Sequence, residues 1–509
     1  MYRFVSYLNR NDIHMITLSS LSENNVQEIL SKKNAEPQWV SSSRKEILSK
    51  FSGLPSEVSP LYSKYTGLTV LKPGNICFSN EEKASISNDL EIRLKEIKSS
   101  PSMLLIGSTA VHIFVPPELS KKGLIISTIQ DAMTNHPELV KKYFKENSVK
   151  YQEDRFLVLG SSAFQSGFFI YIPRNLMIED PIRIVYSLRD DGTSSICRNI
   201  VISEEGSKAT IVQELYSSSS LISTSNGNKS VYGDSKNTSN KVADGYEKQQ
   251  EGYFEFLECD VKPAAELEFI TLQAMNLETI CISNRKSFVE KDAKMSWYSG
   301  MFGSHLCRFK TDSVMNGSGA RSEDVQIVFG TNNQLFDISS NLDHVGFSTR
   351  GKVLVKSIVK DNAKSLFKGM IKIRKNAQTS EAYLAGHAIL LNKGAQADAI
   401  PGLEIETNEV KATHSASVSQ IDEEQIFYLM CKGLDREGAK REIINGFVEP
   451  LSRKMGPFIR AWISYLFENK WTGKPLLLKG DEVMEQIIEV EKSRYKETAD
   501  IFEKHYKYR

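Results

Sequence analysis

The chain repeats one kind of turn just before stretches rich in β-branched and aromatic residues. In each turn a Gly, Asp, Asn or Pro precedes a small residue, which a polar residue follows. Alanine holds the small position at residues 265, 293, 320, 363, 377 and 395, at intervals of 28, 27, 43, 14 and 18 residues. Several of these intervals are near multiples of 14. A shared turn at a loose period indicates segments that turn back on one another and stack.

Stacked coils of this kind bury one face of every strand in a single long core. We therefore predict a parallel β-helix with one strand per coil. A β-sandwich has strands of similar length and is the alternative. Because the turns of a sandwich need not share one chemistry, the repeated turn favours the β-helix. The side chains expected to point into its core are Val353, Val355, Ile358, Ile371 and Ile373.

Four regions follow one another along the chain. Residues 1–150 are predicted to form a mixed helical region, with a short strand at 124–127 and a helical stretch at 129–144 that His136-Pro137 interrupts. Residues 151–420 carry the strand-like runs, beginning with 168–172, 182–186, 199–203 and 210–215. Within them, residues 217–250 are rich in Ser, Asn, Lys and Gly, which predicts a flexible insert.

Helical patterns return after the last strand. In residues 421–455, Asp422 and Gln425 have the spacing of a capping box, and Ile426, Leu429 and Met430 form an apolar face before Gly433. A second helix is expected from about residue 435. These helices either close the β-stack or present a face to a partner, and the sequence leaves both open. Residues 456–509 form a further helical tail, with a charged stretch at 481–505.

Charge and cysteine usage indicate the cellular compartment and exclude some classes of binding partner. Lys and Arg number 64 against 63 acidic residues, so we expect neither nucleic acid nor an anionic membrane as a partner. No stretch approaches the roughly 18 apolar residues of a membrane span, and no signal peptide is recognisable. Six scattered cysteines without a CxxC pair predict a reducing cytoplasm.

Familiar catalytic motifs are absent from the sequence, which argues against a stand-alone enzyme. There is no GxxxxGK[ST], GxSxG, HExxH or GxGxxG. Some β-helix enzymes use clustered carboxylates on glycans, and Asp343 beside His344, or Glu404 with Glu406, are candidates of that kind. Without an export signal, a solvated strand face is the better interpretation of these carboxylates.

Histidines and cysteines are the candidate metal ligands. Among eight histidines, His414 alternates with small residues in a predicted strand, and a neutral imidazole is a competent ligand for iron. Thiolates are the usual ligands of iron–sulfur clusters. Cys259, Cys281 and Cys307 lie in earlier strands, where a small buried apolar residue is the default interpretation.

Several runs resemble the SufB/SufD family of iron–sulfur cluster assembly proteins. The most specific are PGLEIETNEVKATHSA at 401–416 and IDEEQIFYL at 421–429. Supporting matches are EPQW at 36–39, HPELV at 136–140, GFFIYIP at 167–173, DH at 343–344, FKG at 367–369 and RKNAQ at 374–378. The resemblance covers roughly residues 30–455 and leaves out the insert and the tail.

The resemblance implies a right-handed parallel β-helix between an N-terminal α/β region and a C-terminal helical region. It further implies that an ABC-type ATPase, SufC, docks on that C-terminal region, and that SufB and SufD pair through their β-helices with a transient cluster at the interface. The residues that it assigns to docking are Gln425, Ile426, Phe427, Leu429, Met430 and Phe447.

Within the family the chain resembles SufD more than SufB. A SufB-like chain has a cysteine where Gly386 stands here and a Glu where Ser415 follows His414. The resemblance therefore implies that His414 is the cluster-site or interface residue and that this chain holds no cluster stably alone. A homodimeric SufB-type scaffold that uses Cys259, Cys281 or Cys307, and a β-helix enzyme unrelated to iron, remain as alternatives.

Overall fold

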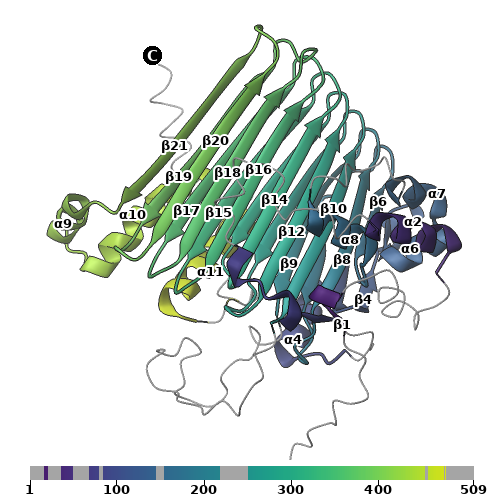
Figure 1. Cartoon of the computed structure of the whole chain (residues 1–509), viewed down its shortest axis with the longest axis horizontal. Helices are drawn as coiled ribbons and strands as arrows, with labels where there is room; N and C mark the ends of the chain where they lie inside the picture. Colours follow the sequence, from purple (N-terminus) through teal and green to yellow (C-terminus); the bar gives the residue numbers. More distant parts are fainter. Residues whose placement is uncertain are drawn as a thin grey trace, which may run out of the picture.

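The computed structural model describes residues 16–20, 36–49, 68–78, 84–144, 154–217, 250–452, 457–474 and 476. Its centre is a parallel β-solenoid made of two facing sheets, which Figure 1 shows as a stack of long strands. Helices from the N-terminal part lie at one end of this stack, and α9 (Glu423–Cys431) lies at the other. The predicted β-helix is therefore confirmed, and the β-sandwich is wrong.

From β6 (Phe168–Ile172) onward, consecutive strands alternate between the two sheets, so one coil contributes one strand to each. Within these two sheets, all described neighbours are parallel except β3 (Ser102–Ile106) with β4 (Thr109–Phe114) and β5 (Ile125–Thr128) with β6, at the N-terminal end. The nine-stranded sheet contains, in spatial order, β20 (Gln396–Ile405), β18 (Lys364–Ile373), β16 (Leu335–His344), β14 (Leu306–Met315), β12 (Ile280–Val289), β10 (Gly252–Val261), β8 (Ser195–Ser203), β6 (Phe168–Ile172) and β5 (Ile125–Thr128). The ten-stranded sheet contains β21 (Lys411–Gln420), β19 (Glu381–Leu390), β17 (Arg350–Val359), β15 (Arg321–Gly330), β13 (Lys294–Met301), β11 (Glu266–Gln273), β9 (Lys208–Tyr216), β7 (Ile182–Ser187), β3 (Ser102–Ile106) and β4 (Thr109–Phe114).

The prediction of one strand per coil is wrong, because each coil has two strands and two corners. The alanines at 265, 293, 320 and 377 lie in the turns that enter the ten-stranded sheet, whereas those at 363 and 395 lie in the turns that enter the nine-stranded sheet. Both corners use the same turn chemistry. The interval of 28 residues is thus one full coil, and the interval of 14 is half of one.

A continuous apolar core fills the space between the sheets. Val353, Val355, Ile371 and Ile373 are buried in it, as predicted. Ile358 is instead buried on the outer face of the ten-stranded sheet. It lies three residues after Val355, and because side chains alternate along a strand, an odd separation places the two on opposite faces.

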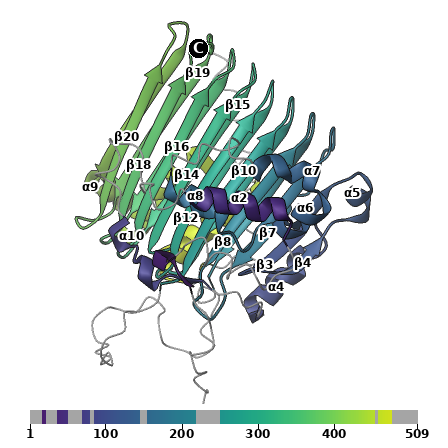
Figure 2. The ribbon, with the colours of Figure 1, turned by 45° about the vertical axis from the view of Figure 1, so that its right-hand side comes forward.

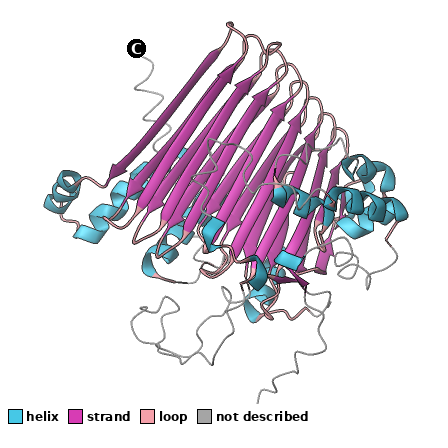
Figure 3. Ribbon diagram, in the orientation of Figure 1, coloured by secondary structure: helices cyan, strands magenta, loops and turns pink. Residues whose placement is uncertain are grey.

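Helices cover part of the outer face of each sheet (Figures 2 and 3). The predicted break in the helical stretch is confirmed, because one helix ends at Asn135 and the next begins at Pro137. Around the nine-stranded sheet lie α2 (Gln38–Leu48), α6 (Ile129–Asn135), α7 (Pro137–Val140) and α8 (Arg155–Ser162). Helices α4 (Asn88–Ile97), α10 (Arg436–Ser452) and α11 (Pro457–Thr472) pack on the ten-stranded sheet. The remaining short elements are β1 (Ile16–Thr17), β2 (Cys77–Phe78), α5 (Pro117–Lys121), and the 3-10 helices η2 (Leu18–Ser20), η4 (Leu68–Val70), η5 (Pro73–Asn75) and η6 (Lys141–Phe144).

Some predictions concern residues that lie outside the described ranges. These are the interior of the insert, His14, His505 and the charged stretch at 481–505. The helix predicted at the start of the tail is confirmed by α11.

A polar cluster interrupts the apolar interior in the middle coils. The side chains of Glu255 and Arg285 are fully buried, with 2.9 Å between Arg285 Nη2 and Glu255 Oε2. Ser283 Oγ donates to the same carboxylate oxygen at 2.6 Å, and Gln213 Nε2 donates to the other at 2.6 Å. Burial alone raises the pKa of a carboxyl group, but Arg285 and these donors hold the pKa of Glu255 below its ordinary value.

We predict that Arg285→Met destabilises the protein by about 3–5 kcal/mol, because it leaves the Glu255 carboxylate buried and without its counter-ion. Urea unfolding measures the change. Arg174→Met, at the exposed ion pair with Glu205, is the matched control and is expected to cost about 1 kcal/mol or less. Equal unfolding midpoints for the two variants would show that the buried pair contributes nothing beyond a surface pair.

Candidate functional site

The solenoid ends at β20 and β21 without a further coil. In the described part of the chain, each of these two strands has a hydrogen-bonded neighbour on one side only. Figure 1 shows both at the end opposite the N-terminal helices. Each strand is ten residues long, so two long rows of backbone N–H and C=O groups face outward. Such an edge is a template for pairing with another chain.

His414 occupies an interior position of this last coil. Its register partner on β19 is Leu384, and the same position of the preceding coils holds Val353 and Asp324. These three residues are buried, whereas His414 is exposed. The difference arises because each coil is covered by the next and no described coil follows β21. The imidazole therefore lies at the open mouth of the core.

Gly386, two residues beyond Leu384, stands where the family resemblance places the cysteine of a SufB-type chain. A Cβ atom at this position would lie 2.2 Å from Cδ1 of Phe367. Phe367 belongs to the interior core, so its ring fills the space that a side chain at 386 needs. Packing around Gly386 thus excludes a thiol here while Phe367 keeps its place.

The other described histidines of the last coils are not brought together with His414. His387 lies three residues after Leu384 and so on the opposite face of β19, where its Nδ1 is 2.7 Å from Ser417 Oγ. His344 ends β16, with its Nδ1 2.8 Å from Thr349 Oγ1. Burial lowers the pKa of His344 to about 4, so it is a neutral core residue at physiological pH.

The carboxylates considered for glycan chemistry take part in ion pairs. Arg374 forms a bidentate pair with Asp343, at 2.8 Å to each oxygen. Lys372 contacts both Glu404 and Glu406 on the neighbouring strand. The arrangement is a ladder of paired surface charges, and it agrees with the interpretation of a solvated strand face.

Cysteines 259, 281 and 307 are buried in the solenoid interior. Cys281 and Cys307 are register partners on adjacent strands. Burial holds the pKa of Cys259 and of Cys281 well above the ordinary thiol value. Since the thiolate is the form that binds metal, this environment disfavours Cys259 and Cys281 as ligands. Cys431, on α9, is exposed.

A second surface lies at the same end of the molecule, on α9 and the turn after it. Asp422 caps the helix as predicted, because its Oδ1 accepts a hydrogen bond from the Glu424 N–H at 2.9 Å. Phe427 is 68% exposed and Tyr428 60%. The exposed apolar side chains of this surface, which we name the α9 face, are Phe427, Tyr428, Met430 and Leu434.

The docking residues that the sequence predicts on α9 differ in their exposure. Gln425, Phe427 and Met430 are exposed and Leu429 is half-buried, whereas Ile426 is fully buried and anchors the helix.

Phe447, on α10, is half-buried against the ten-stranded sheet, with Lys356 Nζ 4.5 Å from its ring centroid. Tyr428 and Leu434 were not singled out from the sequence. Phe427 and Met430, at i and i+3, are the signal in the sequence for this helical face, and Leu434 lies in the turn after the helix.

The described part of the chain contains neither a metal-binding cluster nor a membrane-spanning helix. No group of three or more His, Cys, Asp or Glu side chains there has the arrangement of a metal site. None of the described helices has the length and apolar character to cross a membrane.

Comparison with known proteins connects this geometry to one family. Residues 233–447 match the family model described as "SUF system FeS cluster assembly, SufBD core domain", and residues 31–184 match "SufBD protein N-terminal region". The chain is 26% identical to the iron–sulfur cluster assembly protein SufD of Bacillus subtilis over 431 residues, 84% of this chain and 92% of that protein. It is 25% identical to an iron–sulfur cluster assembly SufBD family protein of Staphylococcus aureus over 451 residues, 86% and 90% of the two chains.

We predict that thiol reagents at pH 8 modify Cys431 in the native protein and leave Cys259, Cys281 and Cys307 unmodified until it unfolds. Mass spectrometry of peptides, before and after addition of guanidinium, measures this. In Cys431→Ser the fast reaction should disappear. Rapid native labelling of Cys281 or Cys307 would contradict the burial and would favour a scaffold that uses these thiols.

Proposed function

The chain belongs to the SufBD family of iron–sulfur cluster assembly proteins, and we propose that it is a SufD-like scaffold subunit which pairs with a SufB-like chain and docks a SufC-like ABC ATPase. The observation that carries this proposal is the open end of the solenoid. There, two edge strands with no described neighbour on their outer side frame an exposed histidine at a position that is buried in the coils before it.

Pairing through β20 and β21 follows from what an open solenoid end needs. The inward row of the last coil contains Ala399, Leu403 and Ala412, which are only partly buried against the core. A second solenoid end placed against this one would cover that row and satisfy the two backbone edges together. We propose a SufB-like chain as the partner that does so.

In the paired state the cluster is cargo, assembled at the interface and passed on. His414 offers an imidazole ligand there, and the partner supplies the thiolate ligands that this coil lacks at Gly386. In this proposal the chain holds no cluster stably by itself and catalyses no reaction of its own. ATP hydrolysis is the work of the docked ATPase, in keeping with the absence of a P-loop motif from this sequence.

The α9 face is the proposed docking site for that ATPase. Clustered large apolar side chains on a protein surface mark sites of protein–protein contact. Phe427 and Tyr428 are exposed, while Ile426 beneath them fixes the helix to the fold. All six cysteines are free thiols, which supports a reducing compartment, and we propose the cytoplasm.

The positions of the cysteines do not support the alternative of a homodimeric SufB-type scaffold. Cys259, Cys281 and Cys307 are buried in the core, away from the open end. Anaerobic reconstitution of this chain alone with iron and sulfide separates the two proposals. A stoichiometric cluster that is lost on replacing these cysteines would establish the homodimeric scaffold and refute the SufD-like one.

We predict that His414→Ala keeps the pairing with the SufB-like chain but lowers cluster assembly by the pair. Loss of a group that merely orients a metal ligand costs roughly 10–100-fold in metal affinity, so loss of a ligand is expected to cost at least about tenfold. Anaerobic reconstitution of the full complex, followed by optical spectroscopy and iron analysis, measures the yield.

The matched control is His387→Ala on the adjacent strand, whose imidazole points to the other face of the sheet. Its cluster yield should equal that of the unmodified complex. An unchanged yield in His414→Ala would remove this histidine from the cluster site. A loss of folding, seen by circular dichroism, would instead make it a structural residue.

We predict that Phe427→Asp abolishes co-purification with the SufC-like ATPase, because it places a charge at the centre of the α9 face. An interface residue of this kind contributes about 2 kcal/mol or more, roughly 30-fold in affinity. Affinity co-purification of the co-expressed proteins measures the effect. Ile92→Asp, at an exposed apolar residue of α4, is the control and should bind normally. Full binding by Phe427→Asp would exclude this face as the docking site.

A further inference from the structure

The outer face of the ten-stranded sheet is divided along the direction of its strands. Toward the ends of the strands it is apolar and covered by α10 and α11, with Val325, Ile327 and Ile358 buried beneath them. At the beginning of the strands it is charged and exposed. Successive strands from β13 to β21 begin, in register, with Lys294, Arg321, Arg350, Glu381 and Lys411.

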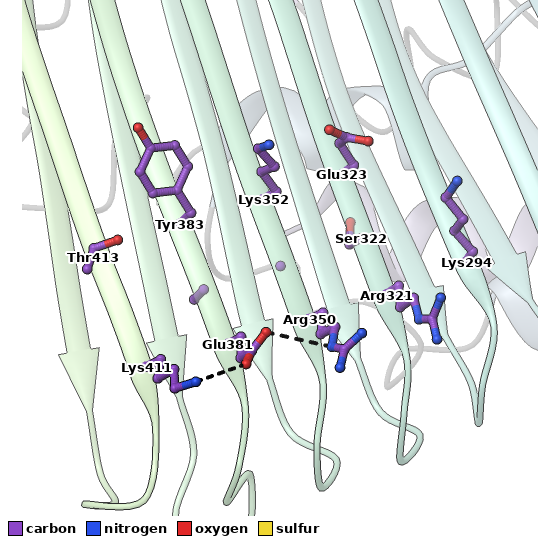
Figure 4. A pocket seen from close by; sticks show the side chains of 12 residues that line it. Lys294, Arg321, Ser322, Glu323, Arg350, Lys352, Glu381, Tyr383, Lys411 and Thr413 are labelled. Carbon is purple, nitrogen blue, oxygen red and sulfur yellow. Dashed lines mark ion pairs between the residues drawn. The ribbon is translucent and has the colours of Figure 1, made fainter. Parts of the chain in front are cut away.

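Carboxylates neutralise this row only in part. Glu381 lies between two cations, 3.8 Å from Arg350 Nε and 3.6 Å from Lys411 Nζ, as the dashed lines in Figure 4 show. Among the described residues, neither Lys294 nor Arg321 forms an ion pair within 4.0 Å. Adjacent strands lie about 4.8 Å apart, so these like charges repel one another across a short distance.

The charged row borders a hollow of about 500 Å³ in the sheet surface. The backbone of Ser322, Gly351 and Ala382 also lines it, and Tyr383 stands beside it (Figure 4). Five cations and two carboxylates line it, which leaves a net positive charge of three. The charged lining residues are Lys294, Arg321, Arg350, Lys352, Lys411, Glu323 and Glu381. We name this feature the basic groove.

The tail of the same chain carries a segment of opposite charge. Residues 481–491 read DEVMEQIIEVE, with five carboxylates and no Lys or Arg. This segment lies outside the residues that the structure describes and beyond the SufBD core match, which ends at residue 447. We propose that the basic groove binds residues 481–491 of its own chain, so that the acidic segment supplies the carboxylates that the row of cations lacks.

The position of the last described residue allows this contact. Leu476 is buried in the same apolar cluster as Val325 and Leu354, on the outer face of the sheet that carries the groove. Just before it, Trp471 packs on Phe329 near the end of β15, and Arg321 begins that strand eight residues earlier, about 26 Å away. The four residues 477–480 span up to about 14 Å when extended, and the acidic segment adds about 36 Å. The segment therefore reaches the groove from where the tail leaves the fold.

The proposal is tested on the full-length protein with a zero-length carbodiimide, which joins carboxylates to lysine amines that touch them. Mass spectrometry should find cross-links from residues 481–491 to Lys294, Lys352 or Lys411. The cross-links should disappear in 1 M NaCl, where the screening length is about 3 Å. They should also be lost in Arg321→Glu/Arg350→Glu and return when Glu485→Arg/Glu489→Arg is added to that variant.

The matched control is Lys364→Glu/Lys393→Glu, which reverses two exposed cations at the opposite corner of the coils and should leave the cross-links unchanged. Circular dichroism confirms that each variant is folded. Cross-links that persist in Arg321→Glu/Arg350→Glu, or none in the unmodified protein, overturn the proposal. Tripolyphosphate that shields the groove lysines from acetylation, without any cross-link to the tail, would assign the groove to a different anion and also overturn it.

Discussion

In a β-solenoid each coil is buried only by the coil before it and the coil after it. The rest of this structure depends on that constraint. At the N-terminal end, the antiparallel strands β4 and β5 complete the two sheets, and helices pack around them. At the C-terminal end β21 and β20 have no described neighbour on their outer side. The proposed site is therefore the place where the repeat stops, and it needs no specialised pocket.

The same constraint explains how one histidine becomes accessible without leaving its register. The interior position that His414 holds is filled by Asp324, Val353 and Leu384 in the coils before it. Burial raises the pKa of Asp324 to about 6, a measure of how strongly this interior disfavours charge. A partner that covers the open end would place His414 in a similar environment.

On the outer faces of the two sheets, the chemistry of each position decides whether the chain's own helices cover it or leave it exposed. Apolar positions near the ends of the strands are covered by helices of the same chain, and the half-buried Lys356 lies there beside the ring of Phe447. The charged positions at the strand starts remain exposed, as does the α9 face. Together with the open end of the solenoid, these are the surfaces that we propose for docking of another protein or of the tail.

Sequence reasoning succeeded where one local pattern corresponds to one element. The strand at 168–172, the helix break at Pro137 and the cap at Asp422 were all predicted, because each depends on neighbours in the sequence. It failed where the pattern has two structural solutions. The shared turn chemistry of both corners concealed the second strand of each coil. Ile358 was predicted to point inward although the alternation of side chains along the strand places it on the outer face. Ile426 was predicted to be a docking residue because it is apolar like its exposed neighbours, but it is buried.

The sequence by itself determined the parallel β-helix, the boundary between strands and helices near residue 420, and membership of the SufBD family. These follow from short-range periodicity and from the runs of residues that resemble the family. Only the tertiary structure decided which residues stand at the open end, which thiols are enclosed, and which cations lie side by side without enough carboxylates. Stacking brings together residues about 30 positions apart in the chain. The exposure of a side chain then depends on whether another coil follows, which no local pattern records.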